Sequence, residues 1–329
     1  MRYKQLNLEK RYQISALIKA GLKQKEIAFE IGVHPSTISR ELRRNNDKVR
    51  GYNAELAQII STQIERKKRK RLSITKPIEK YIRSKLKQDW SPEQISGRMK
   101  IDIGVSVVHE TIYRYIYTNK KNGGKLYKYL RHKNKKYHSR SNDYQARGTL
   151  IDRVMIDKRP KIVEKKNRIG DLEIDTVVGK DHKGFLVTVV DRKSKFVLIK
   201  NVPTKEAKVV TEALIEMIQP IKAITHTITS DNGKEFAYHK QVSAALDTDF
   251  YFANPYHSWE RGLNEHTNGL IRQYLPKKSE FLKVSKDEIL MIQSRLNHRP
   301  RKVLNFKTPY EVFFSEMSAN SNIKCNFLR

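Results

Sequence analysis

Residues 171–178 read Asp-Leu-Glu-Ile-Asp-Thr-Val-Val, and this stretch decides how the second half of the chain folds. Side chains alternate along it with the period of a β-strand that has two different faces. One face carries Leu172, Ile174 and Thr176, and the other carries Glu173, Asp175 and Val177. The pattern therefore predicts a strand that presents carboxylates on one face and apolar groups on the other.

Further strands and helices are expected after this strand. Two β-rich runs, residues 185–191 and 195–202, are separated by a short Arg-Lys-Ser turn and predict a hairpin. Later segments predict a helix after Thr204, a strand at 225–230, a helix at 238–246, a strand at 250–252 and a helix at 259–275. This order predicts an α/β domain with a mixed sheet, in which sites lie at strand ends.

The first 46 residues predict three short helices. Ala28, Gly32 and Ile38 have the spacing of a helix-turn-helix, in which a small residue, a turn glycine and an apolar residue let two helices pack. The outward face of the third helix carries Ser36, Thr37, Ser39, Arg40, Arg43 and Arg44. These side chains can reach base edges and phosphates, so we expect this region to bind DNA. The alternative is a plain three-helix bundle.

The middle of the chain is basic. A charged run at 65–71 precedes a helical pair, which starts at Trp90-Ser91-Pro92-Glu93 and continues near residues 108–117. The pair is interpreted either as a second helix-turn-helix or as a structural bundle. Polar residues then predict a linker. The expected domains are residues 1–50, 51–118, 119–160, 161–318 for the α/β core, and a tail at 319–329.

Charge points to a polyanionic partner. The chain carries 67 Lys and Arg against 35 Asp and Glu, a net charge of +32. Residues 1–160 hold 39 basic and 15 acidic residues, so this half carries +24 of the total. Such asymmetry favours double-stranded DNA over an anionic membrane, for which no amphipathic basic helix is evident. The single Cys325 excludes an internal disulfide and a multi-cysteine zinc site, and fits a cytoplasmic protein.

Three carboxylates are candidates for the chemistry. Asp175 lies on the first core strand, Asp231 follows a later strand at an Asn-Gly turn, and Glu265 lies on a helix, with 33 residues between Asp231 and Glu265. Oxygen ligands without a cysteine or histidine set suit Mg²⁺ or Mn²⁺ better than zinc. Two such ions per site can activate an attacking oxygen and stabilise a leaving oxygen in phosphodiester cleavage. Spacing alone would permit other choices among 35 acids.

The motifs resemble those of bacterial insertion-sequence transposases of family thirty, in the DDE group of transposases and retroviral integrases. The resemblance covers nearly the whole chain. It runs through residues 36–42, 90–95, 109–113, 170–177, 231–236, 261–265, 268–277, 297–302 and 308–311. The triad of that family falls on Asp175, Asp231 and Glu265. Leu172, His266 and His298 depart from its usual pattern, which has Trp, Asn and Asn there.

The resemblance implies a ribonuclease H-like core and a transposase that recognises terminal inverted repeats and also contacts target DNA. It further implies homodimers or higher homo-oligomers on DNA, a bacterial protein associated with the nucleoid, and copy-out, paste-in transposition through a circular intermediate. Two rivals remain. One is a sequence-specific regulator without catalysis, and the other is a recombinase with a covalent Ser or Tyr nucleophile.

Further expectations concern the roles of individual residues around the triad. Five side chains are expected to contact DNA or to orient Glu265, with ordinary surface roles as the alternative: Arg261, Asn264, Asn268, Arg272 and Lys277. Glu173 is expected to lie behind the metal ligands or at the surface, rather than to be a ligand itself. Glu235 is expected to be a residue at the start of a helix. Asn232 and Gly233 are expected to shape the turn beside Asp231. No role is assigned to Tyr256 or His257.

Overall fold

The computed structural model describes residues 6–47, 51–67, 74–131, 152–255, 257, 260 and 262–319. These residues divide into two compact units, one within residues 1–72 and the other within residues 73–329. No helix of the described residues is both long and apolar enough to cross a membrane.

The N-terminal unit is a small helical domain. It contains α1 (Leu8–Lys19), α2 (Gln24–Ile31), α3 (Pro35–Asn45), the short strands β1 (Asn46–Asp47) and β2 (Gly51–Tyr52), and α4 (Ala54–Lys67). Gly32 ends α2 with φ +66°, the left-handed conformation that glycine adopts without steric cost. Ile14, Ala28 and Ile38 are buried between the helices. The expected helix-turn-helix is confirmed.

A buried ion pair joins the elements of this unit. Arg11 on α1 lies 2.8 Å from Glu41 on α3, and both side chains are almost fully buried. The Tyr52 hydroxyl donates to the same Glu41 carboxylate at 3.1 Å. Burial and the Glu41 charge raise the pKa of Tyr52, so the hydroxyl stays protonated and can donate. The pair fixes which face of α3 is turned inward.

A helical bundle begins the second unit. It consists of α5 (Lys76–Lys87), α6 (Pro92–Ile103), α7 (His109–Lys121) and the 3₁₀ turn η1 (Leu126–Tyr129). Ser91 accepts a hydrogen bond from the Gln94 N–H, while the Gln94 side chain caps Ser91, so the start of α6 satisfies its own donors. The sequence predicted α6 and α7 but missed α5, whose apolar residues Ile78, Ile82 and Leu86 stand among lysines.

Ion pairs and hydrogen bonds join this bundle to the α/β core. The Arg98 guanidinium on α6 binds both carboxylate oxygens of Glu311, at 2.6 and 2.5 Å. Arg295 lies 2.6 Å from Asp89, and Lys302 lies 2.7 Å from Glu93. A Cβ added to Gly97 would lie 2.4 Å from the Phe306 ring, so the contact requires a glycine in α6.

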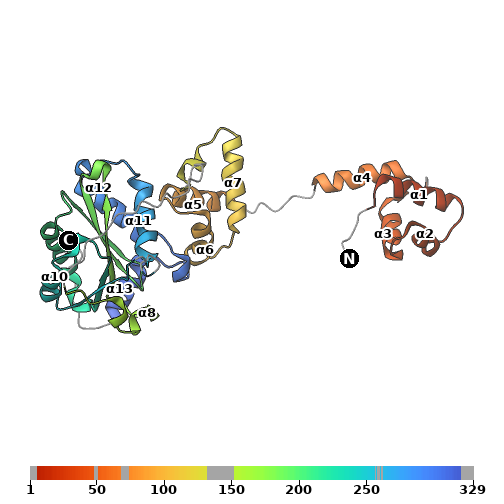
Figure 1. Ribbon diagram of the computed structural model, residues 1–329. Coiled ribbons are helices and arrows are strands. Elements are labelled where there is room, and N and C mark those ends of the chain that lie inside the picture. Colours follow the sequence, from red (N-terminus) through yellow and green to blue (C-terminus); the bar gives the residue numbers. More distant parts are fainter. Residues whose placement is uncertain are drawn as a thin grey trace. The chain divides into compact units, whose positions relative to one another are not determined.

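The core is built on a five-stranded mixed sheet in the order β5-β4-β3-β6-β7 (Figure 1). Strands β3 (Asp171–Val178), β4 (Phe185–Asp191) and β5 (Val197–Val202) are antiparallel neighbours, as the hairpin prediction required. Strands β6 (Thr227–Ser230) and β7 (Asp249–Phe252) extend the sheet in parallel. Met155 bridges to Phe252, so residues expected to belong to a linker contact this sheet.

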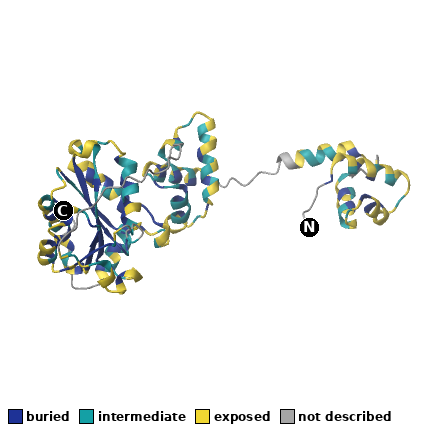
Figure 2. Ribbon diagram, viewed as in Figure 1, coloured by how far each residue is buried: buried dark blue, intermediate teal, exposed yellow. Residues whose placement is uncertain are grey.

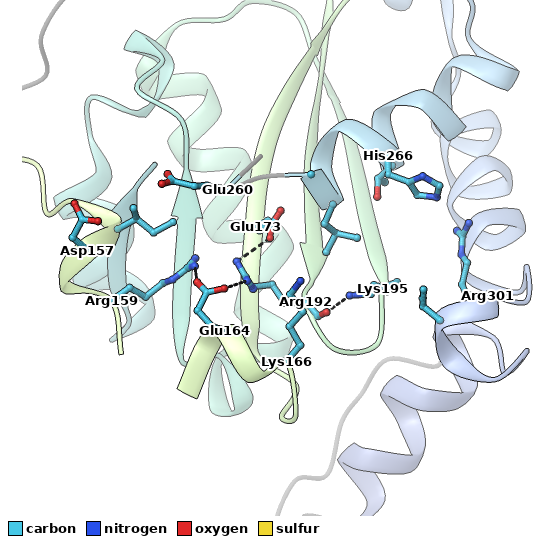
Figure 3. Close-up of a pocket in the computed structure, with 15 residues that line it drawn as sticks. Asp157, Arg159, Glu164, Lys166, Glu173, Arg192, Lys195, Glu260, His266 and Arg301 are labelled. Carbon is cyan, nitrogen blue, oxygen red and sulfur yellow. Dashed lines mark hydrogen bonds and ion pairs between the residues drawn. The ribbon is translucent and has the colours of Figure 1, made fainter. Parts of the chain in front are cut away.

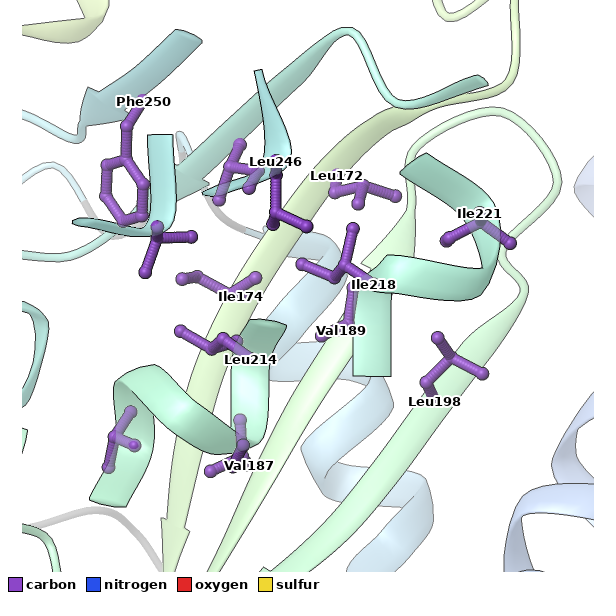
Figure 4. Close-up of a cluster of buried hydrophobic side chains, with 14 of the residues drawn as sticks. Leu172, Ile174, Val187, Val189, Leu198, Leu214, Ile218, Ile221, Leu246 and Phe250 are labelled. Atoms are coloured by element: carbon purple, nitrogen blue, oxygen red, sulfur yellow. The ribbon is translucent and has the colours of Figure 1, made fainter. Parts of the chain in front are cut away.

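Helices cover both faces of the sheet, and the strands between them are the most buried part of the unit (Figure 2). On one face, Leu172 and Ile174 pack with residues of α9 (Ala207–Ile218) and α10 (His239–Leu246) (Figure 4). On the other, Val177 packs with α11 (Gly262–Tyr274) and α12 (Lys286–Asn297). The remaining helices are α8 (Ile162–Lys165) and α13 (Pro309–Ala319). The alternation predicted for residues 171–178 therefore divides two cores, and it turns Asp175 towards α11.

Short 3₁₀ turns connect these elements: η2 (Ile156–Lys158), η3 (Lys180–His182), η4 (Gln219–Ile224), η5 (Lys234–Phe236), η7 (Phe281–Lys283) and η8 (Lys302–Leu304).

The contact between the helical bundle and the α/β core is expected to weaken at acid pH, because it includes the Glu311 carboxylate. Hydrogen bonding by Arg98 lowers the pKa of Glu311 from 4.5 to about 2. A depressed carboxyl pKa stabilises the fold above pH 4.5, and this contribution is lost as the pH falls towards 2. Glu311→Gln should therefore lower the unfolding temperature at neutral pH, and the difference from wild type should shrink across that window.

Glu316→Gln, on the same helix, is the control. It removes a carboxylate that lies 2.6 Å from Lys193, and this pair connects two parts of the α/β core rather than the core and the bundle. Thermal unfolding of all three proteins from pH 7 to pH 2 would make the comparison. A Glu311→Gln deficit that stays constant over this range would contradict the assignment to the Arg98 pair.

Candidate active site

Parallel pairing brings together the two segments that carry Asp175 and Asp231. Asp171 pairs with Thr227, Leu172 with Ile228 and Glu173 with Thr229, a constant offset of 56 residues. Continued two residues beyond the last pair, the same offset matches Asp175 with Asp231, which directly follows the last residue of β6. Residues in register on parallel neighbours point to the same face of a sheet. Both carboxylates are half-buried.

Helix α11 carries the third carboxylate and contacts the end of β3 beside Asp175. The Asn264 side chain donates to the Ile174 carbonyl oxygen at 3.0 Å, and the Asn268 side chain donates to Asp175 Oδ2 at 2.8 Å. Glu265 is exposed and precedes Asn268 by three residues, so the two share a face of the helix. The contact between Asn268 and Asp175 therefore brings the face that carries Glu265 to the end of β3.

Backbone donors orient both aspartates. Asp175 Oδ1 accepts the Thr176 N–H at 2.9 Å, and Asp231 Oδ1 accepts the Gly233 N–H at 2.9 Å. Asn232 is buried, donates to the Ala253 carbonyl oxygen at 2.7 Å and accepts from Arg153. The Asn-Gly pair thus forms the turn beside Asp231, as expected from the sequence.

Glu235 connects the two aspartate segments. Its side chain is buried, and Oε1 accepts the Thr176 hydroxyl at 2.9 Å and lies 2.7 Å from Lys205 Nζ. A Cβ added to Gly233 would lie 2.3 Å from the Glu235 carboxylate, so the side chain folds back over the turn. Glu235 begins a helical turn as expected, but its carboxylate also connects the residue after Asp175 to the turn after Asp231.

Glu173 is a buried carboxylate, which makes the expectation of a surface acid wrong. It is 2% exposed and lies 3.0 Å from Arg192, which also contacts Glu164 at 3.0 Å. Arg159 contacts Glu164 in turn and donates to Thr229 Oγ1 at 2.8 Å. The physical reason is pairing, since a carboxylate can be buried when an arginine compensates its charge. No local sequence signal connects these distant residues.

The three carboxylates suit a hard divalent cation by their chemistry. Among the described residues, no three or more His, Cys, Asp and Glu side chains form a group that could hold a metal ion as the side chains stand. Mg²⁺ commonly takes only one or two carboxylates, and water and substrate phosphates complete its shell. Carboxylates also repel one another without a cation between them. The donor set of Asp175, Asp231 and Glu265 therefore fits Mg²⁺ or Mn²⁺ bound together with a phosphate.

The residues expected to read DNA lie on an accessible face of α3. Ser39, Arg40, Arg43 and Arg44 are exposed, while Ser36 and Thr37 are half-buried. Ile38 and Glu41 on the opposite face are buried. The side chains available to a partner are therefore four of the six named from the sequence, with the other two nearer the domain core.

The residues expected to contact DNA from the core have different surroundings. Asn264 is fully buried, and Arg272 donates to the Val178 carbonyl oxygen at 2.6 Å while lying over the Phe281 ring. With Asn268, these side chains hold α11, the helix that carries Glu265, on β3. Lys277 is exposed. Arg261 and Tyr256 lie outside the described residues, and His257 contacts Glu260 at 3.2 Å.

Replacing Glu235 should destabilise this arrangement. Glu235→Ala removes the acceptor of Thr176 and the partner of Lys205, and loss of a hydrogen bond to a buried charged group costs about 1.5–3 kcal/mol. Glu235→Gln keeps an acceptor for Thr176 and should lose less. The measurement is urea unfolding of each variant beside Glu212→Ala, which removes an exposed carboxylate on α9. Equal stability of Glu235→Ala and Glu212→Ala would refute this role for Glu235.

Two family profiles and several known proteins are similar to this chain. The profile of a helix-turn-helix domain matches residues 2–45, and that of an integrase core domain matches residues 167–258. The transposase for insertion sequence element IS4351 of Bacteroides fragilis is 46% identical over 97% of this chain and 98% of its own length. The transposase InsI for IS30A of Escherichia coli K12 is 33% identical over 93% of this chain and 82% of its own length.

A third relative, the transposase for IS1086 of Cupriavidus metallidurans, is 35% identical over 94% of both chains. Among solved structures, the catalytic core domain of BIV integrase matches 46% of this chain and 97% of its own, with a TM-score of 0.38 and 18% identity.

Proposed function

The chain belongs to the insertion-sequence transposases, the family of the IS30 and IS4351 enzymes, and we propose that it cuts and joins DNA with divalent metal ions held by Asp175, Asp231 and Glu265. The observation that supports the proposal is the β3–β6 register, whose offset of 56 residues, continued two residues beyond the last pair, matches Asp175 with Asp231. The hydrogen bond from Asn268 to Asp175 adds the helix face of Glu265 to this pair.

The residues of the chain prepare the site for a phosphodiester. The N–H groups of Thr176 and Gly233 each hold one oxygen of an aspartate, and Asn268 holds the second oxygen of Asp175. Fixed donors of this kind reduce the reorganisation required when the substrate binds. Mg²⁺ or Mn²⁺, two ions in the proposed site, supply activation of the attacking oxygen and stabilise charge on the leaving oxygen.

The proposed reaction has two phosphoryl-transfer steps. Water first attacks phosphorus at the end of the element, the P–O3′ bond breaks, and the 3′ oxygen leaves as a hydroxyl after taking a proton. That 3′-hydroxyl then attacks a second phosphodiester, forms a new P–O bond and releases the 3′ oxygen of that strand. Neither step needs an oxidant or a covalent protein intermediate, so carboxylate-bound cations suffice for both.

The N-terminal unit is proposed to direct the reaction to the terminal inverted repeats. The exposed Arg40, Arg43 and Arg44 on α3 provide charge for phosphates and donors for bases. We further propose that the protein acts as a homodimer or a higher homo-oligomer on DNA. Such an assembly would hold two ends together for copy-out, paste-in transposition through a circular intermediate.

The test is cleavage and joining of duplexes that carry the inverted repeats flanking the gene, with Mg²⁺ or Mn²⁺. Wild type should release a 3′-hydroxyl product and join it to DNA. Asp231→Asn should retain binding and lose the chemistry by about a thousandfold or more, as expected for a residue that acts in a concerted catalytic group. Asp247→Asn, which makes the same change at an exposed position after α10, is the matched control.

Sequence-specific binding without cleavage by folded wild-type protein would reject this mechanism. That result would instead support the alternative of a DNA-binding regulator without catalysis. Loss of binding together with chemistry in Asp231→Asn would show a structural role for Asp231.

A further inference from the structure

A cavity of about 640 Å³ lies beside the proposed active site, on the same face of the sheet (Figure 3). Its walls come from η2, β3, the turn between β4 and β5, the start of α11 and the loop after α12. Five cationic side chains line it and define what we call the basic pocket: Arg159, Lys166, Arg192, Lys195 and Arg301. Asp175, Asp231 and Glu265 are not among its described lining residues.

The carboxylates in the pocket already have partners. Glu164 lies between Arg159 and Arg192, and Glu173 lies 3.0 Å from Arg192. Glu260 accepts the Asn254 N–H at 2.8 Å, and Asp157 accepts from the Asn254 side chain at 3.2 Å. These acids therefore neutralise one side of the pocket, the side that Figure 3 shows around Glu164.

The other side contains a buried arginine bonded to a neutral group. Arg301 is 9% exposed, its Nη2 donates to the Leu296 carbonyl oxygen at 3.1 Å, and its Nε finds no hydrogen-bond partner among the described residues. Burial and the neighbouring Arg299 lower the pKa of Arg301 to about 10, so it is charged at neutral pH. A buried cation is costly without an anion. Because Arg301 lines the pocket, an anion bound there would compensate this charge.

Several other cations surround this arginine. Burial, followed by the charges of Arg301, Arg131, Arg299 and Lys195, lowers the pKa of His266. Arg299 is 3% exposed and donates to the amide oxygens of Gln94 and Gln273, at 2.9 and 3.0 Å, which carry no charge. The potential on this side of the pocket is therefore positive, and it suits an anion.

The pocket is close enough to the proposed active site to hold the same DNA strand. Glu173 in its wall precedes Asp175 by two residues on one face of β3, a separation of about 7 Å along a strand. Gly262, the first residue of the 13-residue helix α11, also lines the pocket.

We propose that the basic pocket binds a backbone phosphate of the DNA strand that occupies the active site, with Arg301 as the principal anion-binding side chain. This inference rests on the proposed function. A phosphate is favoured because guanidinium groups bind its oxygens through charge-assisted hydrogen bonds. Such a contact would set the position of the strand relative to Asp175 without taking part in the chemistry.

The test is a binding scan in EDTA, where no cleavage occurs. The probes are end duplexes in which one phosphate at a time is replaced by a neutral methylphosphonate. Wild type should lose roughly tenfold in affinity at one position near the cleavage site, the size expected for one arginine–phosphate contact. Arg301→Gln should bind the unmodified duplex more weakly and be insensitive to the substitution at that position.

A second variant covers the possibility that Arg301→Gln does not fold. Val303 lines the mouth of the pocket and is 77% exposed, so its replacement should leave the fold intact. Val303→Asp should weaken binding by repelling the phosphate, whereas the similarly sized but neutral Val303→Asn should bind like wild type. Equal binding by these two variants would count against the proposal.

The outcomes separate this proposal from the proposed function. A flat methylphosphonate scan, with normal cleavage by wild type, overturns the pocket proposal alone. A position-dependent scan without cleavage overturns the catalytic proposal and leaves the pocket. Stabilisation of wild type, but not Arg301→Gln, by inorganic pyrophosphate together with a flat scan would assign the pocket to a free anion and overturn its assignment to DNA.

Discussion

The parallel pairing of β3 with β6 is the constraint on which the rest of the catalytic half depends. Its offset of 56 residues, continued two residues beyond the last pair, matches Asp175 with Asp231, although a hairpin and a helix separate them in the chain. A shift of one residue in this register would turn one carboxylate into the opposite core. Buried residues on both faces of β3, such as Ile174 and Val177, oppose that shift.

Polar side chains then position α11 and the turn after β6 against this apolar sheet. Asn264 and Asn268 attach α11 to β3, one through a backbone carbonyl and the other through the Asp175 carboxylate. Glu235 makes an equivalent connection between β3 and the turn after β6. Both connections cross between elements, so the positions of the acids are set by hydrogen bonds between separate segments.

Local patterns predicted most of the fold, whereas the candidate triad was chosen through the family resemblance, because spacing alone left other acids possible. The alternation at 171–178, the hairpin and the bounds of α2 follow from period and turn residues, and the structure contains all three. Helix α5 was overlooked, although the four-residue spacing of Ile78, Ile82 and Leu86 among charged residues is itself a helical pattern. The burial of Glu173 depends on Arg192, which lies on another strand's end, and nothing near Glu173 in sequence reveals it.

The Arg299 side chain has a consequence for domain exchange between relatives. It hydrogen bonds at once to Gln94 on α6 and to Gln273 on α11, while Arg98 binds Glu311 on α13. A chimeric protein joined between residues 118 and 160 would separate these partners and leave buried guanidinium groups from one parent facing unmatched surfaces from the other. A junction near residue 72, where one compact unit ends, keeps both sets of contacts within a single parent.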